Sequence, residues 1–453
     1  MFLIRKLTHY FVLLASRFLP DPFVLVSMLT CFVFVVGIFL TNQSPIQMLN
    51  HWGNGIWGLL AFSMQMALTL VLGRAVASAP VISRILNTLA SMPKTPSGAI
   101  ILVTMVGMIA SYINWAFGLV VGAIFAREIA KNVKGVDYRL LIASAYSSFI
   151  IFQGGLSSSV ALILAQGGET LYKTTGGILS DPIPVSETIF ATYNIIIIVI
   201  IFILLPIVLA SIHPSKEDTI QIDSALLEDK QDIEVISHKD DHTIAQKLEN
   251  SRLLCFFTGA FGIVYLVMYF YNGGTLGLNI VIMIFLFVGI LLHKTLIDYV
   301  KVISNSTKSS AGIILQFPFY AGIMGMMVGK SPDGDSLASV ISIIFSNIST
   351  QETFPLFSFL SAGIVNIFVP SGGGQWSVQG PVMIATAQSL GTNPSVVAMA
   401  IAWGDAWTNM IQPFWALPAL AIAGLGAKDI MGYCLITLIL SGIVISFVFY
   451  FLV

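Results

Sequence analysis

Long runs of apolar residues alternate with short polar or glycine- and proline-rich segments along the whole chain. Each of the longest runs can cross a bilayer as a helix, because one crossing needs about 20 apolar residues. These runs cover residues 22–41, 189–212, 253–271, 278–293 and 430–452. Since they extend from one end of the sequence to the other, the pattern predicts an all-α integral membrane protein with several spans.

The composition agrees with this prediction. The chain has 453 residues, of which 56% are hydrophobic and 9% charged, whereas soluble domains carry about a quarter charged residues. The net charge of −1 and the lack of a Lys/Arg-rich cluster exclude nucleic acid as an expected partner. The sequence contains no GxxxxGK[ST] nucleotide loop, so any transport would draw its energy from an ion gradient rather than from ATP.

Charged residues predict the orientation and the domain organisation. Arg5, Lys6 and Arg17 precede the first span, and the loop 42–54 after it holds no Lys or Arg, which predicts a cytoplasmic N-terminus. A polar, charged stretch then separates two apolar halves. The predicted segments are an interfacial N-terminal helix (1–20), a first membrane repeat (21–212), a charged cytoplasmic linker (213–252) and a second membrane repeat (253–453).

The two halves resemble each other in sequence. Residues 31–40 read CFVFVVGIFL and residues 283–292 read MIFLFVGILL, which pairs Gly37 with Gly289 at an offset of 252 residues. The first run follows the basic residues Arg5, Lys6 and Arg17 and so crosses from the inside to the outside. The second run ends at Lys294 and so crosses from the outside to the inside. This reversal predicts the inverted-topology repeat of a secondary transporter, with re-entrant hairpins or broken helices. Further pairs are Ala110 with Ala362, Asn114 with Asn366, and Gln153 with Gln412.

Four polar or glycine-rich interruptions lie within apolar sequence, around residues 114–118, 153–159, 370–376 and 404–413. Inverted-repeat transporters place substrate where helices are interrupted, because half-helix N-termini bind anions and free carbonyls bind cations. The alternative is that these glycines and amides only hold helices together. The candidate substrate-binding residues are Asn114, Gly118, Gln153, Ser157, Ser158, Asn366, Ser371, Gly372, Gly373, Gly374, Gln375, Trp376 and Gln379.

Asp405 is a carboxylate inside an apolar stretch, and such a residue is by default part of a coupling or ion pathway. We expect it, with Asn409 and Gln412, to carry H⁺ or to help bind Na⁺; the alternative is a helix N-cap at a break. No Lys or Arg occurs between residues 331 and 427, which favours a small monocarboxylate or a neutral solute as substrate. No organic cofactor and no other metal site is expected.

Four longer motifs carry a family resemblance: LPDPFVLVSMLT, INWAFGLVVGAIFARE, VPSGGGQWSVQGP and QPFWALPALAIAGLGAKDIMGYC. They closely resemble the AtoE-type short-chain fatty acid transporters, over nearly the whole chain except the linker. The resemblance implies uptake of acetoacetate and butyrate, a multi-pass protein of the bacterial cytoplasmic membrane, and membership of the wider ion transporter superfamily. It further implies hairpin tips near Asn114 and Gly372, a homodimer and an elevator-like motion.

Three classes of function therefore compete. The first is symport of a short-chain carboxylate with H⁺ or Na⁺, and its variant is transport of another small carboxylate on the same fold. The second is a channel-like facilitator, which would show neither saturation nor counterflow. The third, a membrane enzyme, would need a nucleophile or metal cluster inside the spans, and the sequence shows none.

Overall fold

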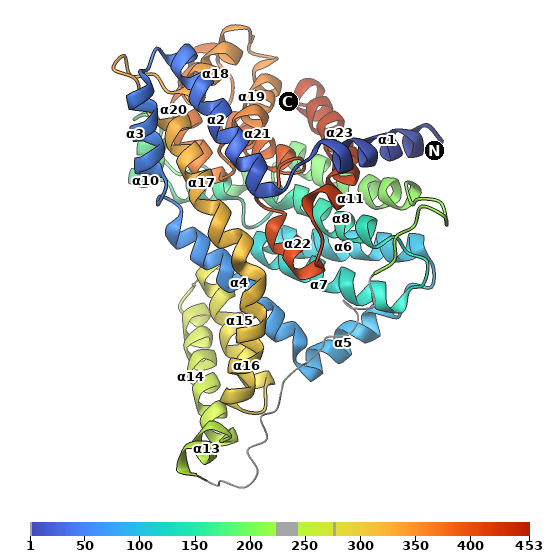
Figure 1. The fold of residues 1–453 in the computed structure, drawn as a ribbon. Helices are drawn as coiled ribbons and strands as arrows, with labels where there is room; N and C mark the ends of the chain where they lie inside the picture. The colour runs from blue at the N-terminus through green and yellow to red at the C-terminus, as the bar shows by residue number, and fades with distance from the viewer. Residues whose placement is uncertain (1, 223–242, 275–277) are drawn as a thin grey trace.

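A computed structural model describes residues 2–222, 243–274 and 278–453, and every regular element in these ranges is helical (Figure 1). Eight of the described helical stretches are long and apolar enough to cross a membrane. They are α2, α4, α6, the stretch Tyr138–Gln166, α11, α14, α17 and α23. The predicted all-α membrane class is thus confirmed. The middle half of the predicted linker, residues 223–242, lies outside the described ranges.

The first half of the chain supplies the elements up to α11. They are α1 (Phe2–Phe18), α2 (Pro22–Thr41), α3 (Pro45–Gly55), α4 (Leu60–Ser78), α5 (Pro80–Ala90), α6 (Pro96–Ile113), α7 (Trp115–Asn132), α8 (Tyr138–Ser147), the 3₁₀ helix η1 (Ser148–Gly154), α9 (Ser159–Gln166), α10 (Gly168–Thr174), η2 (Val185–Glu187) and α11 (Thr192–Ser211).

The second half supplies the remainder. These elements are α13 (Ile244–Glu249), α14 (Arg252–Tyr271), α15 (Leu278–Leu292), α16 (Leu296–Thr307), η3 (Lys308–Ser310), α17 (Ala311–Val328), α18 (Leu337–Asn347), α19 (Phe354–Asn366), α20 (Gly372–Leu390), α21 (Pro394–Thr408), α22 (Leu417–Ala423) and α23 (Ala427–Phe451).

Local sequence fixes many of the helix starts. Pro occupies the first turn of α2, α3, α5, α6, α19, α21 and α22, where its missing N–H removes no helical bond. In α2 the Asp21 carboxylate also accepts a 2.8 Å hydrogen bond from the N–H of Phe23. Such starts divide the apolar sequence into separate helices.

The two halves repeat the same order of elements. In chain order α2 to α7 correspond to α15 to α20, the α8–η1 segment corresponds to α21, and α9 and α11 correspond to α22 and α23. The packing is reciprocal, because α3 lies on α17 of the other half while α16 lies on α4. Gly37 lies against Met48 of α3, and Gly289 lies against Tyr299 of α16. The glycine pair found in the sequence thus has the same packing role in each half.

In space the helices form two groups, each built from both halves. The frame group contains α2, α3, α4, α14, α15, α16 and α17, and its helices α4, α14, α15 and α16 run down the lower left of Figure 1. The broken-helix group contains α6 to α11 and α19 to α23. Helices α5 and α18 link the groups along the chain. Each spatial group contains helices from both repeats, so the groups do not coincide with the repeats. The segment boundaries given from the sequence therefore stay a prediction.

Helix α1 packs on α23, which belongs to the broken-helix group. Thr8 and Ala15 are buried at 3% and 7% exposure, and a Cβ on Gly432 would meet the backbone of Val12 at about 2.5 Å. The N-terminal segment predicted as an interfacial helix is therefore helical and also makes a close contact within the protein. Its position in the membrane interface stays a prediction.

Candidate functional site

The four interruptions predicted from the sequence converge in the broken-helix group. The break at Asn114 separates α6 from α7, which pack against each other as a hairpin. Next to it, the Trp115 N–H donates a 2.9 Å hydrogen bond to Ser157 Oγ, and the Leu156 N–H donates one of 2.8 Å to the Tyr112 carbonyl. The interruptions at 114 and 153–159 are therefore joined directly.

The side chain of Gln153 then joins the first half of the chain to the second. Its Nε2 donates to Asp405 Oδ2 at 2.8 Å and to Ser159 Oγ at 3.1 Å. Its Oε1 accepts from the Ser159 N–H and from Ser158 Oγ, each at 3.1 Å. One buried amide thus fixes the start of α9 and holds the carboxylate of α21.

The N-terminus of α20 lies on this pair. A Cβ placed on Gly372 would collide with Gln153 Nε2 and Ser159 Oγ and would lie 3.4 Å from Asp405 Oδ2. A Cβ on the next residue, Gly373, would meet nothing within 4 Å. Since the first N–H groups of a helix have no intrahelical acceptor, α20 presents its partly positive end beside Asp405 with open space at Gly373.

Asp405 is the buried carboxylate of the site. It is 1% exposed, and its Oδ1 has no hydrogen-bond partner within the described part of the chain. It lies inside α21, which Asn393 caps, so the alternative interpretation of Asp405 as an N-cap is wrong. A buried carboxylate with a single neutral donor is poorly satisfied, because a charge away from water needs compensation.

Asn366 organises the break that follows α21. Its Nδ2 donates to the Asp405 carbonyl at 2.7 Å, to Thr408 Oγ1 at 3.0 Å and to Asn409 Oδ1 at 2.8 Å. Gln412 Nε2 donates to the same Asn409 oxygen at 2.9 Å, and Gln412 Oε1 accepts from the Phe414 N–H at 3.1 Å. Asn366, Asn409 and Gln412 therefore shape the interruption beside Asp405.

Other predicted residues hold helices together. Gln375 Nε2 donates to the Ala362 carbonyl and to Gln379 Oε1, while Gln379 Nε2 donates to Ser342 Oγ and Ser361 Oγ. These bonds fasten α20 to α18 and α19.

Five more of the predicted residues make contacts within or between helices. Trp376 Nε1 donates to Thr174 Oγ1 of α10 at 3.1 Å. Gly118 packs on Ser111 of α6, Asn114 caps α7, and Ser371 Oγ accepts from the Gly374 N–H at 3.4 Å. Within the predicted set, Gln153 and Asn366 bond to Asp405, Ser158 bonds to Gln153, and Gly372 lies against the Gln153–Asp405 pair. Gly373 follows Gly372 along the chain, and Ser157 bonds to Trp115 at the neighbouring break.

Ser159, which belongs to the predicted interruption 153–159, contacts Gln153. Sequence reasoning did not single out two other polar residues of this region, Thr408 and Asn194. Thr408 donates to the Gly363 carbonyl at 2.8 Å. Asn194 of α11 donates to the carbonyls of Gly154 and Ile189 and accepts from Trp403 Nε1 at 2.8 Å. Asn194 could have been found from the sequence, because it is the one Asn in the apolar run 189–212 and an amide in an apolar span needs partners within the protein.

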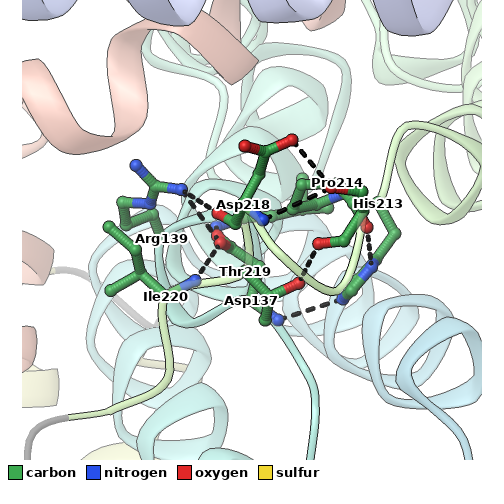
Figure 2. Close-up of polar contacts among 9 residues, drawn as sticks. Asp137, Arg139, His213, Pro214, Asp218, Thr219 and Ile220 are labelled. Carbon is green, nitrogen blue, oxygen red and sulfur yellow. Dashed lines mark hydrogen bonds and ion pairs between the residues drawn. The ribbon is translucent and has the colours of Figure 1, made fainter.

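A separate polar cluster fastens the chain after α11 to the start of α8 (Figure 2). The fully buried Asp137 accepts from the N–H groups of Leu140 and Ile220 and forms a 3.0 Å ion pair with Arg139. The Asp137 N–H donates to His213 Nε2 at 3.0 Å. Residues 213–220, predicted as the start of a solvated linker, are thus bound to α8.

Together, the spans, the repeated order of helices and the polar breaks define a multi-pass membrane transporter rather than an enzyme. The sequence profile described as "Short chain fatty acid transporter" matches residues 3–452. The chain belongs to this family of short-chain fatty acid transporters, which confirms the resemblance found in the motifs.

Similar proteins occur in two bacteria, and both are named "Putative short-chain fatty acid transporter". The one from Escherichia coli K12 is 45% identical over 443 residues, covering 98% of both chains. The one from Haemophilus influenzae Rd is 44% identical over 454 residues, covering 99% of this chain and all of the relative.

Two solved structures also align over most of the chain. The Alcanivorax borkumensis YdaH transporter has a TM-score of 0.42, with 96% of this chain and 97% of that chain covered. The Neisseria gonorrhoeae MtrF structure has a TM-score of 0.39, with 97% and 96% covered. Each is 15% identical to this chain.

Proposed function

We propose that this protein is a secondary active transporter that carries short-chain fatty acids such as acetoacetate and butyrate together with H⁺ or Na⁺. The observation that carries the proposal is the placement of the α20 N-terminus against the buried Gln153–Asp405 pair. It combines a site for an anion with a carboxylate whose charge is not balanced by a cationic side chain.

The anion would bind at the first N–H groups of α20. Helix N-termini attract carboxylates without a basic side chain, and no Lys or Arg occurs from residue 331 to residue 427. The small side chains from Ser371 to Gly374 allow close approach, and the space at Gly373 is open. A substrate with one carboxylate suits this site better than a dicarboxylate, which would favour an arginine clamp.

Coupling would follow from the charge of Asp405. A substrate carboxylate beside an ionised Asp405 places two negative charges together in a poorly screened interior, which is unfavourable. A cation on the unpartnered Oδ1 removes this repulsion, either as a proton or as Na⁺ held with neighbouring amide oxygens. Binding of the anion and of the cation would therefore favour each other.

The proposed movement is elevator-like, with the broken-helix group shifting along the frame group. The arrangement of the helices supports this proposal. All the polar breaks belong to the broken-helix group, and α4 and α17 of the frame group pack against that group. A homodimer, expected from the family resemblance, stays a prediction.

The first test is radiolabelled butyrate uptake into proteoliposomes, with Na⁺ and pH gradients imposed separately. Acetoacetate, succinate and leucine serve as competitors. We expect saturable accumulation driven by one of the gradients and inhibited by acetoacetate alone. Saturable transport of another carboxylate would correct the substrate, whereas flux without saturation or counterflow would indicate a channel-like facilitator.

The coupling role is tested with Asp405→Asn. An Asn keeps an oxygen that can accept from Gln153 Nε2 but removes the charge, so we expect gradient-driven accumulation to be lost while exchange of labelled for unlabelled butyrate persists. Asp181→Asn, which changes an exposed carboxylate, is the matched control and should leave accumulation unchanged. Normal accumulation by Asp405→Asn would remove Asp405 from the coupling mechanism.

A further inference from the structure

Helix α5 exposes an apolar stripe although it is too short to cross a membrane. Val81, Ile85 and Leu89 are 53%, 52% and 44% exposed, and Met92 just beyond the helix is 64% exposed. The three helical residues lie four apart and thus form one line along the helix. The buried Ala90 lies on a different part of the helix surface, so the stripe is left over after α5 has packed on α4 and α7.

The position of α5 places this stripe at an end of the transmembrane helices. The helix follows α4 and precedes α6, and both neighbours are candidate spans. Asn132, the last residue of α7, donates from Nδ2 to Asn87 Oδ1 of α5 at 3.3 Å. Since α6 and α7 form a hairpin, the start of α6 and the end of α7 lie on the same side. In Figure 1, α5 lies at the outer edge of the molecule beside these ends.

The surroundings of the stripe are basic. Arg84 on α5 and Lys94 between α5 and α6 are exposed, and so is Lys134 shortly after α7. No Asp or Glu occurs from residue 22 to residue 127. The first acidic residue after this stretch, Glu128, is already engaged with Lys131 in a 2.7 Å ion pair. The sequence therefore provides positive charge here with little acidic competition.

The repeat-related helix α18 provides an internal comparison. It also exposes apolar residues, with Ile343 at 37% and Ile344 at 52%. Its neighbourhood in sequence is different, because Asp333 and Asp335 precede it and Lys330 is the last basic residue before position 428. Exposed apolar surface is thus common to both repeats, whereas the positive charge is specific to α5.

We propose that α5, with Arg84, Lys94 and Lys134, forms a binding surface for anionic phospholipids. The stripe lies among acyl chains, and the basic side chains contact the headgroups, as in interfacial amphipathic helices. Because α5 connects α4 of the frame group to the α6–α7 hairpin, whose turn lies at Asn114, a lipid held here also restrains the position of that hairpin. The proposal is independent of the transported substrate.

The test uses the full-length protein in mild detergent with equal amounts of phosphatidylglycerol and phosphatidylcholine, and native mass spectrometry measures which lipid is retained. We expect the wild-type protein to retain phosphatidylglycerol preferentially. Arg84→Gln/Lys94→Gln should reduce this preference by about fivefold for each charge removed, given the attraction of one basic residue to an anionic surface. Added salt should weaken the preference of the wild type more than that of the variant.

The matched control is Lys173→Gln/Lys330→Gln, which removes two exposed positive charges away from α5 and should keep the preference. Ile85→Asn interrupts the stripe and should lower the retention of both lipids. If the double variant does not fold, as judged by gel filtration, Lys94→Gln alone tests the charge in an exposed connection. Unchanged preference in the α5 variants, an equal loss in the control, or full displacement by glycerol phosphate would each overturn the proposal.

Discussion

At the scale of single residues, the site depends on the contact between Gly372 and Gln153. Gln153 uses both ends of its amide, one for Asp405 and one for the start of α9, so it has no freedom to move away. The helix that carries the free N–H groups can approach only because residue 372 has no side chain. Three elements distant in sequence are thereby held together without an ion pair.

Two neighbouring glycines provide a sharp test of this contact. Gly372→Ala places a methyl group against Gln153 and Ser159, and such overpacking costs about 1–3 kcal/mol. We expect a lower unfolding temperature and loss of butyrate uptake. Gly373→Ala adds the same methyl group in open space, so it should keep the stability while raising the KM for butyrate if the substrate carboxylate lies there. Equal stability of the two variants in thermal unfolding would contradict the packing argument.

The sequence predicted the identity of these residues better than their roles. Polar side chains in apolar stretches marked Gln153, Asn366 and Asp405, because such groups are expensive in a membrane unless they are used. The same criterion also selected Gln375 and Gln379, which bond helices together. The two cases look alike in sequence, since only the three-dimensional contacts distinguish an amide facing a carboxylate from one that faces a serine.

At the scale of elements, the broken helices depend on amides from neighbouring helices. The 3₁₀ segment η1 ends at Gly154, whose carbonyl accepts a 3.0 Å hydrogen bond from Asn194 of α11. Asn194 in turn accepts from Trp403 of α21. Freed backbone groups inside a membrane need such partners, and here one side chain serves both repeats.

Asn194→Leu should therefore destabilise this arrangement. It leaves two carbonyls and the Trp403 Nε1–H without their partner, and the loss should amount to roughly 2–4 kcal/mol. A drop in unfolding temperature in detergent would measure it. Tyr193→Phe, at the adjacent position, removes one exposed 3.3 Å hydrogen bond and serves as the control. If both variants unfold at the same temperature, Asn194 is not what stabilises the break.

At the scale of the whole molecule, the repeat could be predicted but its arrangement in space could not. Matching glycines and the reversal of charge across the spans suffice to infer two inverted halves. They do not reveal that α3 packs on α17 and α16 on α4, because that exchange depends on contacts between halves. For the same reason, the segments α5 and α18 could not be recognised as links between two groups.

The proposed movement of one group along the other can be tested by cross-linking. Gly73 of α4 lies on the frame group and Val120 of α7 on the broken-helix group, and a Cβ on Gly73 would be 3.7 Å from that of Val120. Within the broken-helix group, a Cβ on Gly122 of α7 would be 3.6 Å from that of Ala145 of α8. Both separations suit a disulfide.

Each pair is changed to cysteine in a background that lacks the native Cys31, Cys255 and Cys434. If the groups move past each other, oxidation of Gly73→Cys/Val120→Cys should stop butyrate uptake, and reduction should restore it. Oxidation of Gly122→Cys/Ala145→Cys joins two helices that move together and should leave uptake intact. Continued uptake by the fully cross-linked first pair would show that transport does not require α7 to leave α4, and the elevator-like movement would have to be abandoned.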